Sequence, residues 1–195
     1  MTDRARDADD DEVRAIAELI RSRRTINLYQ PDPVAKQVLL DAIELARWAP
    51  NHKLTQPWRF YLFGPETTAA AIDCWSAYEA ERKGAPQGEA RRKRLESIPG
   101  HFVLTSARDP DTVIDLENYA ACCCAAQNLM LYLWQRGVGA KWTTGAITRE
   151  ERLYRVLAID SSVERIVGYF WYGRPKVVAP PQPRRAVEDI VERLP

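Results

Sequence analysis

The sequence predicts an α/β or α+β sandwich built as one domain. Its 195 residues lie within the usual range for a single domain and are enough to bury a core. Hydrophobic residues make up 46% of the chain, as expected for an ordered globular protein. Segments of helical periodicity alternate with short β-prone runs, in the order helix, helix, strand, helix, strand, long helix, strand, helix, strand.

The first third of the chain reads as two helices. Residues 1–11 are expected to be a disordered, charged tail, which leaves residues 12–195 as the domain. Apolar residues recur at helical spacing from Glu12 to Ser22 and again from about Val34 to Trp48, where Pro50 ends the second helix. Residues 23–33 form a polar connection between them.

The middle of the chain reads as strand, helix and strand. Residues 58–63 are aromatic and bounded by proline and glycine, which predicts a strand. Thr67 or Thr68 is expected to cap the next helix. Residues 82–99 are charged and contain glycine and proline, so they are expected to form a mobile, partly helical surface excursion. Residues 101–106 predict a short buried strand.

The most helix-like stretch spans residues 117–136, and Gly137 is placed as its C-terminal cap. This helix is apolar nearly all round, which is typical of a helix buried within a domain or across a subunit interface. Residues 138–143 and 165–172 predict strands with a helix between them. The proline-rich remainder predicts an irregular tail that lies across another surface.

The charge balance narrows the class of partner. The chain has 28 basic and 27 acidic residues, a net charge of +1, which argues against a nucleic acid or an anionic membrane as the main partner. No apolar run is long enough to predict a membrane helix.

The four cysteines predict neither a metal site nor a disulfide. Cys122, Cys123 and Cys124 are consecutive and cannot converge on one ion, so they are interpreted as small buried thiols in a helix. Reduced thiols and the lack of an apparent signal peptide favour the cytoplasm.

The side chains alone form no recognisable catalytic set. The common nucleophile-elbow, zinc-protease and nucleotide-phosphate motifs are all missing, and the two histidines have no evident acid–base partner. The chemistry is therefore expected to come from a cofactor.

Three segments could hold such a cofactor. Adjacent guanidiniums and a hydroxyl in Arg23-Arg24-Thr25 suit a phosphate, although a solvated basic helix end is the simpler interpretation of this segment alone. The loop from Ala49 to Phe60 presents His52 and Gln56 just before a strand, and a plain rigid turn is its alternative. The segment from Gly137 to Gly145 offers close backbone approach, the flat face of Trp142 and two threonines, or is only a strand with a turn at each end.

Together these segments resemble the nitroreductase-like family of FMN enzymes. The resemblance rests on Arg23-Arg24-Thr25, on Gln56-Pro57-Trp58-Arg59-Phe60 and on Gly173-Arg174-Pro175, in that order, and spans residues 13 to about 178. The small-protein branch, with Ala-Pro-x-His-Lys ahead of Gln-Pro-Trp and a Gly-x-Gly-x-x-Trp segment, is the most similar.

The resemblance implies an α+β sandwich with a central, mostly antiparallel sheet flanked by helices, in an intertwined homodimer whose sites lie between the subunits. It also implies roles for nine residues. The phosphate and ribityl chain would contact Arg23, Arg24, Thr25 and Arg174, the ring or ribityl hydroxyls would contact His52 and Gln56, and the isoalloxazine would be lined by Trp142, Thr143 and Thr144.

Two positions depart from the family pattern. Many relatives carry a basic residue two positions after the arginine motif, where this chain has Asn27; that charge would stabilise the anion that develops on the flavin. Lys53 or Lys141 is a candidate replacement. Leu54 stands where relatives outside the small branch often carry asparagine.

The implied activity is hydride transfer from NADH or NADPH, through flavin N5, to a small acceptor such as a nitroaromatic, a quinone or an enone, by a ping-pong cycle. No side chain is required as an acid or a base. The alternatives are a flavin-binding or regulatory protein without turnover, and an enzyme of the same fold that uses reduced flavin with oxygen. A helical interaction module without a cofactor ranks last.

Overall fold

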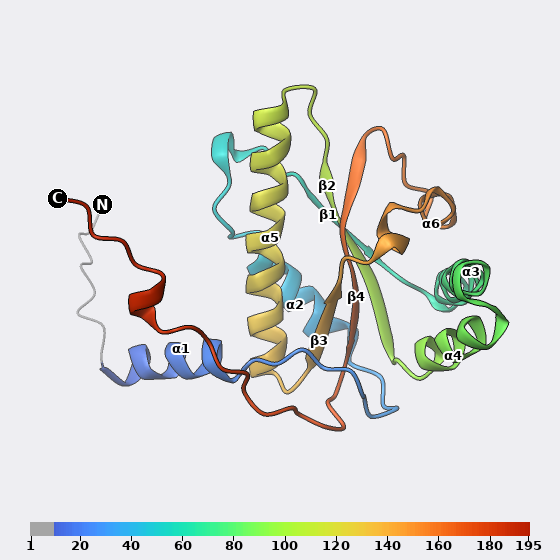
Figure 1. Cartoon of the computed structure of the whole chain (residues 1–195), viewed down its shortest axis with the longest axis horizontal. Coiled ribbons are helices and arrows are strands. Elements are labelled where there is room, and N and C mark those ends of the chain that lie inside the picture. The colour runs from blue at the N-terminus through green and yellow to red at the C-terminus, as the bar shows by residue number, and fades with distance from the viewer. Residues whose placement is uncertain (1–9) are drawn as a thin grey trace.

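The computed structural model describes residues 10–195, in which helices cover both faces of one sheet (Figure 1). Four strands of this part of the chain form an antiparallel sheet in the order β1-β2-β4-β3. The strands are β1 (Trp58–Leu62), β2 (Gly100–Ala107), β3 (Gly139–Thr143) and β4 (Glu164–Gly173). The α+β class and the antiparallel sheet are confirmed.

The helices differ from their predicted bounds mainly at their starts. α1 (Asp10–Ser22) includes Asp10 and Asp11, so these two residues are not part of a tail; residues 1–9 lie outside the described part of the chain. α2 spans Lys36–Ala46. α3 (Pro65–Lys83) begins at its proline after Gly64, earlier than the predicted threonine cap.

The partly helical character predicted for residues 82–99 is confirmed by the helix α4 (Ala85–Glu96), but the segment is packed and is not a loose excursion. Leu95 and Ile98 are buried at its end, and α4 packs against α3. Hydrophobic anchoring against a neighbouring helix therefore overrides the charged, glycine- and proline-containing composition that suggested a mobile segment.

α5 (Thr112–Gln135) is longer than predicted because Asp111 caps it, accepting hydrogen bonds from the amides of Val113 and Ile114. Gly137 follows with φ +70°, and the amide of Val138 reaches back to the carbonyl of Leu133 at 2.8 Å, as in a glycine-terminated helix. One side of α5 is exposed in the single chain, including Leu116 at 65%, so the helix is not buried all round.

The sheet divides the core into two layers. One face of β4 presents Tyr169 and Trp171 to α3, α4 and α6 (Glu151–Val156), and the opposite face presents Phe170 to α2 and α5. Cys122 lies in the second layer, whereas Cys124 is exposed, so only part of the cysteine run is buried as predicted.

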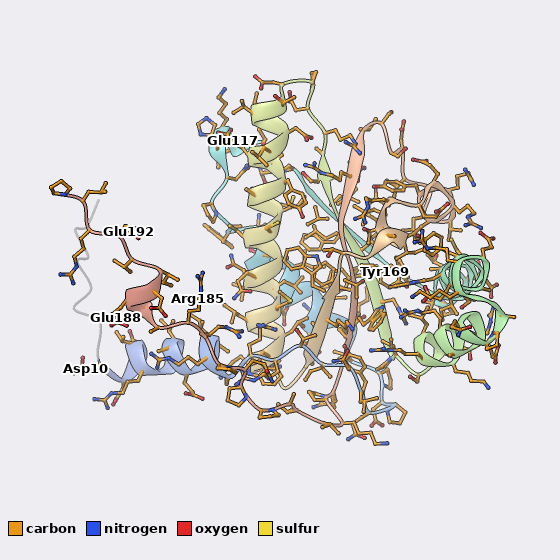
Figure 2. The ribbon with its side chains drawn as sticks, in the orientation of Figure 1. Asp10, Glu117, Tyr169, Arg185, Glu188 and Glu192 are labelled. Carbon is orange, nitrogen blue, oxygen red and sulfur yellow. The ribbon has the colours of Figure 1, made fainter. Side chains whose placement is uncertain are left out.

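The chain after β4 leaves the sheet and forms no further strand among the described residues. It contains the short 3₁₀ turn η3 (Val187–Asp189) and ends on the side of the molecule where α1 lies (Figure 1). Figure 2 shows the side chains in the same view: Tyr169 lies inside the domain, whereas Arg185, Glu188 and Glu192 lie near α1.

Candidate functional site

The Arg23-Arg24-Thr25 segment is held directly against β3. Thr25 forms a parallel bridge with Ala140, and the amide of Ile26 donates to the carbonyl of Ala140 at 3.3 Å. Gly139 allows this approach, since a Cβ there would overlap Cγ1 of Ile26. The first and third predicted segments are therefore adjacent in space.

A cluster of guanidiniums forms at this junction. Arg23 is half-buried, and burial followed by the charges of Arg24 and Arg184 lowers its pKa. Arg24 donates from Nη1 to the carbonyls of Arg21 and Arg23, while its buried Nε has no hydrogen-bond partner. Within residues 10–195, no carboxylate forms an ion pair with Arg23, Arg24 or Arg184. Closely spaced cations without counter-ions suit a phosphate.

Arg184 is a member of this cluster that sequence reasoning missed. It lies in the irregular C-terminal segment, where no pattern links it to a helix or a strand. Only the return of this segment toward α1 brings it near Arg23. The sequence offered an isolated Arg-Arg pair among prolines and no reason to place it here.

Arg174 lies at the same end of the sheet. Its carbonyl accepts from the amide of Gln30 at 2.8 Å, and a Cβ on Gly137 would lie 4.0 Å from its Nη1. Tyr29 and Pro175 form a further bridge. The segment after the arginine motif and the end of β4 therefore run together, which leaves Arg174 exposed beside the start of β3.

The side chains at the end of β3 point to both faces of the sheet. The indole of Trp142 packs on Phe170 with ring centroids 5.6 Å apart, and its Nε1 donates to the carbonyl of Val167. Phe170 covers one face of this partly exposed indole, and the lining of a ring ligand by Trp142 stays a prediction. Thr143 faces the other layer and donates from Oγ1 to the carbonyl of Tyr169 at 2.7 Å, whereas Thr144 is exposed.

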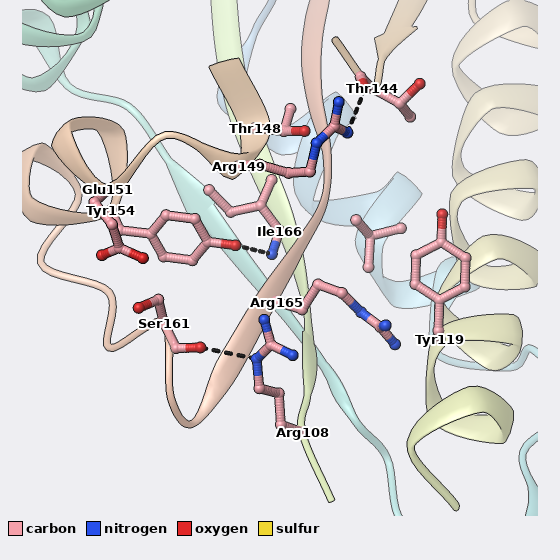
Figure 3. Close-up of a pocket in the computed structure, with 11 residues that line it drawn as sticks. Arg108, Tyr119, Thr144, Thr148, Arg149, Glu151, Tyr154, Ser161, Arg165 and Ile166 are labelled. Atoms are coloured by element: carbon pink, nitrogen blue, oxygen red, sulfur yellow. Dashed lines mark hydrogen bonds between the residues drawn. The ribbon is translucent and has the colours of Figure 1, made fainter. Parts of the chain in front are cut away.

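A polar pocket of about 470 Å³ opens beside Thr144 (Figure 3). Three arginines contribute to it: Arg149 donates to the carbonyl of Thr144 at 3.3 Å, Arg108 donates to the carbonyl of Ser161, and Arg165 pairs with Asp115. The full lining is Arg108, Tyr119, Thr144, Thr148, Arg149, Glu151, Tyr154, Ser161, Arg165, Ile166 and Val167. Its excess of guanidiniums suits a polar or anionic group.

The loop that carries His52 and Gln56 lies away from the arginine cluster. Both side chains are exposed, in the 3₁₀ turn η1 (His52–Leu54) and just after it. Lys53, Leu54 and Gln56 all have positive φ values, between 46° and 55°, and Asn51 braces the turn by accepting from the amide of Gln56 at 2.6 Å. A strained, braced turn at the surface is typical of a loop that contacts a ligand or a partner.

The length of α5 separates this loop from the arginine cluster. Thr55 donates to Asn118 near the start of α5, whereas Trp134 near its end donates to Ser22 of α1. The sixteen residue steps from Asn118 to Trp134, at about 1.5 Å each, place these contacts roughly 24 Å apart. One chain therefore brings Arg23, Arg24, Thr25 and Arg174 to the start of β3, whereas Thr143 lies at the other end of that strand and His52 and Gln56 lie beyond the start of α5.

Metal and membrane features are also lacking in the described part of the chain. Residues 10–195 contain no cluster of three or more metal-ligating side chains. None of their helices is long and apolar enough to cross a bilayer.

Comparison with known proteins defines the class. The model of the nitroreductase family matches residues 20–174. The Bacillus subtilis protein YfhC, which bears a provisional NAD(P)H nitroreductase name, is 29% identical over 89% of this chain and 91% of its own. The Escherichia coli protein YdjA, with a name of the same kind, is 26% identical over 85% and 90%.

Solved structures agree with that class. A nitroreductase-like protein from Bacillus cereus superposes with a TM-score of 0.82 at 27% identity, covering 92% of this chain and 95% of that one. A Desulfovibrio desulfuricans protein solved in complex with FMN shares the fold, with a TM-score of 0.74 at 21% identity over 92% and 96%. The chain is an oxidoreductase of the NAD(P)H-dependent flavin class. It belongs to the nitroreductase family.

Proposed function

We propose that this protein binds FMN and transfers hydride from NADH or NADPH to a small oxidised acceptor, such as a nitroaromatic, a quinone or an activated enone. Donor and acceptor would use the same site in turn. The observation that carries the proposal is the cluster of unpaired guanidiniums that Gly139 and Ile26 fix against β3, in a chain of the nitroreductase family.

The residues present fit FMN. Arg23, Arg24 and Arg174 would hold the phosphate with Arg184, and the partnerless buried Nε of Arg24 is a donor left for such a ligand. Thr25 would contact the ribityl chain. FMN, when bound, supplies the acceptance and release of hydride.

The chain's own part is to bind and orient the ring. Thr143 and exposed Thr144 would line it at the end of β3. Trp142 would contribute only its backbone, because its indole is engaged by Phe170 and Val167.

A second subunit would complete each site. His52 and Gln56 would reach the flavin of the partner chain, since about 24 Å of α5 separates them from the arginines of their own. α1 has no buried residue in the single chain, and Val13, Ile16 and Ile20 are each more than half exposed. An uncovered apolar helix face of this kind is typical of a subunit interface. A cytoplasmic location, consistent with the free cysteines, belongs to the same proposal.

The first test is an absorbance spectrum of the purified protein, followed by anaerobic addition of NADH and, separately, NADPH. We expect a flavin spectrum that bleaches with a preferred donor and returns with a quinone or a nitroaromatic. Bound flavin that neither donor reduces would indicate a binding protein. Reduced flavin that only oxygen reoxidises would indicate an oxygen-using enzyme. Protein that takes up no FMN would refute the proposal.

Arg23→Met tests the phosphate contact. Loss of a charged hydrogen-bond donor should weaken FMN binding about 10- to 100-fold, measured by quenching of flavin fluorescence. Arg14→Met is the matched control, since Arg14 is an exposed arginine of α1 paired with Asp11 at 3.3 Å. Equal affinities of the two variants would contradict the role of Arg23.

A further inference from the structure

Asn27 stands at the position where the family resemblance implies a cation, and the structure brings two cations to it. Its Oδ1 accepts a hydrogen bond from Nζ of Lys141 at 2.8 Å and another from Nη2 of Arg94 at 3.0 Å. Lys141 comes from β3 and Arg94 from α4, so three separate parts of the chain meet at one amide oxygen.

The two cations also share one aromatic ring. Nζ of Lys141 lies 4.9 Å from the ring centre of Trp171, and the guanidinium carbon of Arg94 lies 5.1 Å from it. Stacking on an indole fixes the positions of both charges and removes part of their hydration. They are therefore placed side chains and not freely moving surface groups.

This pair lacks a counter-ion. Across residues 10–195, neither Lys141 nor Arg94 forms an ion pair with a carboxylate. Burial, then the charges of Arg94 and Arg91, lowers the pKa of Lys141. Arg91 is itself paired with Glu79, at 3.7 Å. Two like charges held on one neutral oxygen repel each other, and an anion bound beside them would relieve that repulsion.

The pair lies between the two segments that are proposed to hold FMN. Asn27 follows Thr25 by two residues, and Lys141 follows Ala140, the bridge partner of Thr25. Along β3, Lys141 is on the same face as Thr143, because side chains alternate along a strand. A flavin ring lined by Thr143 would therefore lie on the same face of the sheet as the side chain of Lys141.

We propose that Lys141 and Arg94, held by Asn27, stabilise the negative charge on the pyrimidine ring of reduced FMN, in place of a cation at position 27. This proposal rests on the proposed function. A hydride brings two electrons and one proton from NAD(P)H, which leaves as NAD(P)⁺, so the ring gains one negative charge. Cations beside it bind the reduced form more tightly than the oxidised form.

The proposal assigns a role to the charged segment between α3 and β2. α4 is anchored by Leu95 and Ile98, and that anchoring presents Arg94 to Asn27. Asn27 is a positioning residue, while Lys141 and Arg94 supply the charge.

The test is the midpoint potential of bound FMN, measured by reductive titration against reference dyes, together with the dissociation constant of oxidised FMN. Lys141→Met and Arg94→Met should each lower the preference for reduced over oxidised FMN about tenfold, which is about 30 mV for a two-electron couple. Arg94→Lys keeps the charge and should keep most of the potential. Asn27→Lys in the Lys141→Met background should restore it.

Lys93→Met is the matched control, because Lys93 lies on α4 beside Arg94, is paired with Glu89 and has a side chain 74% exposed. The proposal is overturned if the Lys141 and Arg94 variants bind FMN at the wild-type potential, or if Lys53→Met alone lowers it. Failure of the wild-type protein to bind FMN would instead refute the proposed function, which keeps the two failures distinct.

Discussion

At the scale of single residues, the first feature is His101, whose ring is enclosed in the core. It is 3% exposed in β2, its Nδ1 lies 3.0 Å from the hydroxyl of Tyr169, and Phe63 stacks on its ring. Burial lowers the pKa of His101 from its usual 6.5 to about 4, although the backbone at Leu95 and Ile98 acts in the opposite direction. The imidazole is therefore neutral in the folded protein at neutral pH.

This histidine should make stability depend on pH. The unfolded chain takes up a proton near pH 6.5 and the folded chain only near pH 4, so stability is full above pH 6.5 and falls as the pH drops through that interval. Between pH 7.5 and pH 5 the contribution lost is about 2 kcal/mol. Denaturant unfolding at both pH values should show this loss in the wild type and a smaller one in His101→Gln. Equal losses in the two proteins would rule out His101 as the source.

At the scale of elements, the approach of the 23–27 segment to β3 depends on one missing side chain. A Cβ on Gly139 would overlap Ile26, which is 1% exposed, and would also lie 3.1 Å from Cγ of Pro175. The same contact places Arg23, Arg24 and Thr25 beside the start of β3. Packing and ligand binding therefore depend on the same few atoms.

Gly139→Ala should cost about 1–3 kcal/mol of unfolding free energy by overpacking, and should weaken FMN binding as the arginines shift. Gly64→Ala is the control: nothing lies within 4 Å of its added Cβ, so we expect a change within about 0.5 kcal/mol. Urea unfolding and fluorescence titration measure the two effects. A Gly139→Ala protein with wild-type stability would show that Ile26 can move aside.

Elements with strong local patterns were predictable from sequence, and those fixed by distant contacts were not. The aromatic run of β1 and the apolar run of α5 identify their own structure. α4 does not, because its anchors at Leu95 and Ile98 have meaning only against α3 and the sheet. The face of the sheet to which the Trp142 side chain points likewise depends on the register of β3 with β4.

The candidate site shows the same division. The arginine motif could be read from residue types, whereas its position beside β3 is known only from the structure. Arg94 and Arg184 could not be found that way, since each is brought to the site by the fold of a segment without a motif.

At the scale of the whole molecule, the two halves of the proposed site lie at opposite ends of α5. Two chains related by a twofold axis could pair the loop of one with the arginines of the other, twice. The exposed apolar residues of α1 and the exposed side of α5 supply surface for that contact.

Mixed dimers test this arrangement. Arg23→Met and Gln56→Ala should each reduce FMN binding as homodimers. In a heterodimer of the two variants, one site collects both substitutions and the other collects none, so about half of the wild-type FMN content should return. Tagged chains refolded together and purified by both tags provide the measurement. No recovery would mean that each chain builds its site alone.

The distance along α5 has a consequence for dilution. If each site is shared between two subunits as proposed, a single chain should bind FMN only weakly, however much of the cofactor is supplied. The activity per chain should then fall when the protein is diluted below the concentration at which subunits associate. Added FMN should restore this activity only to the extent that its binding promotes association of the subunits.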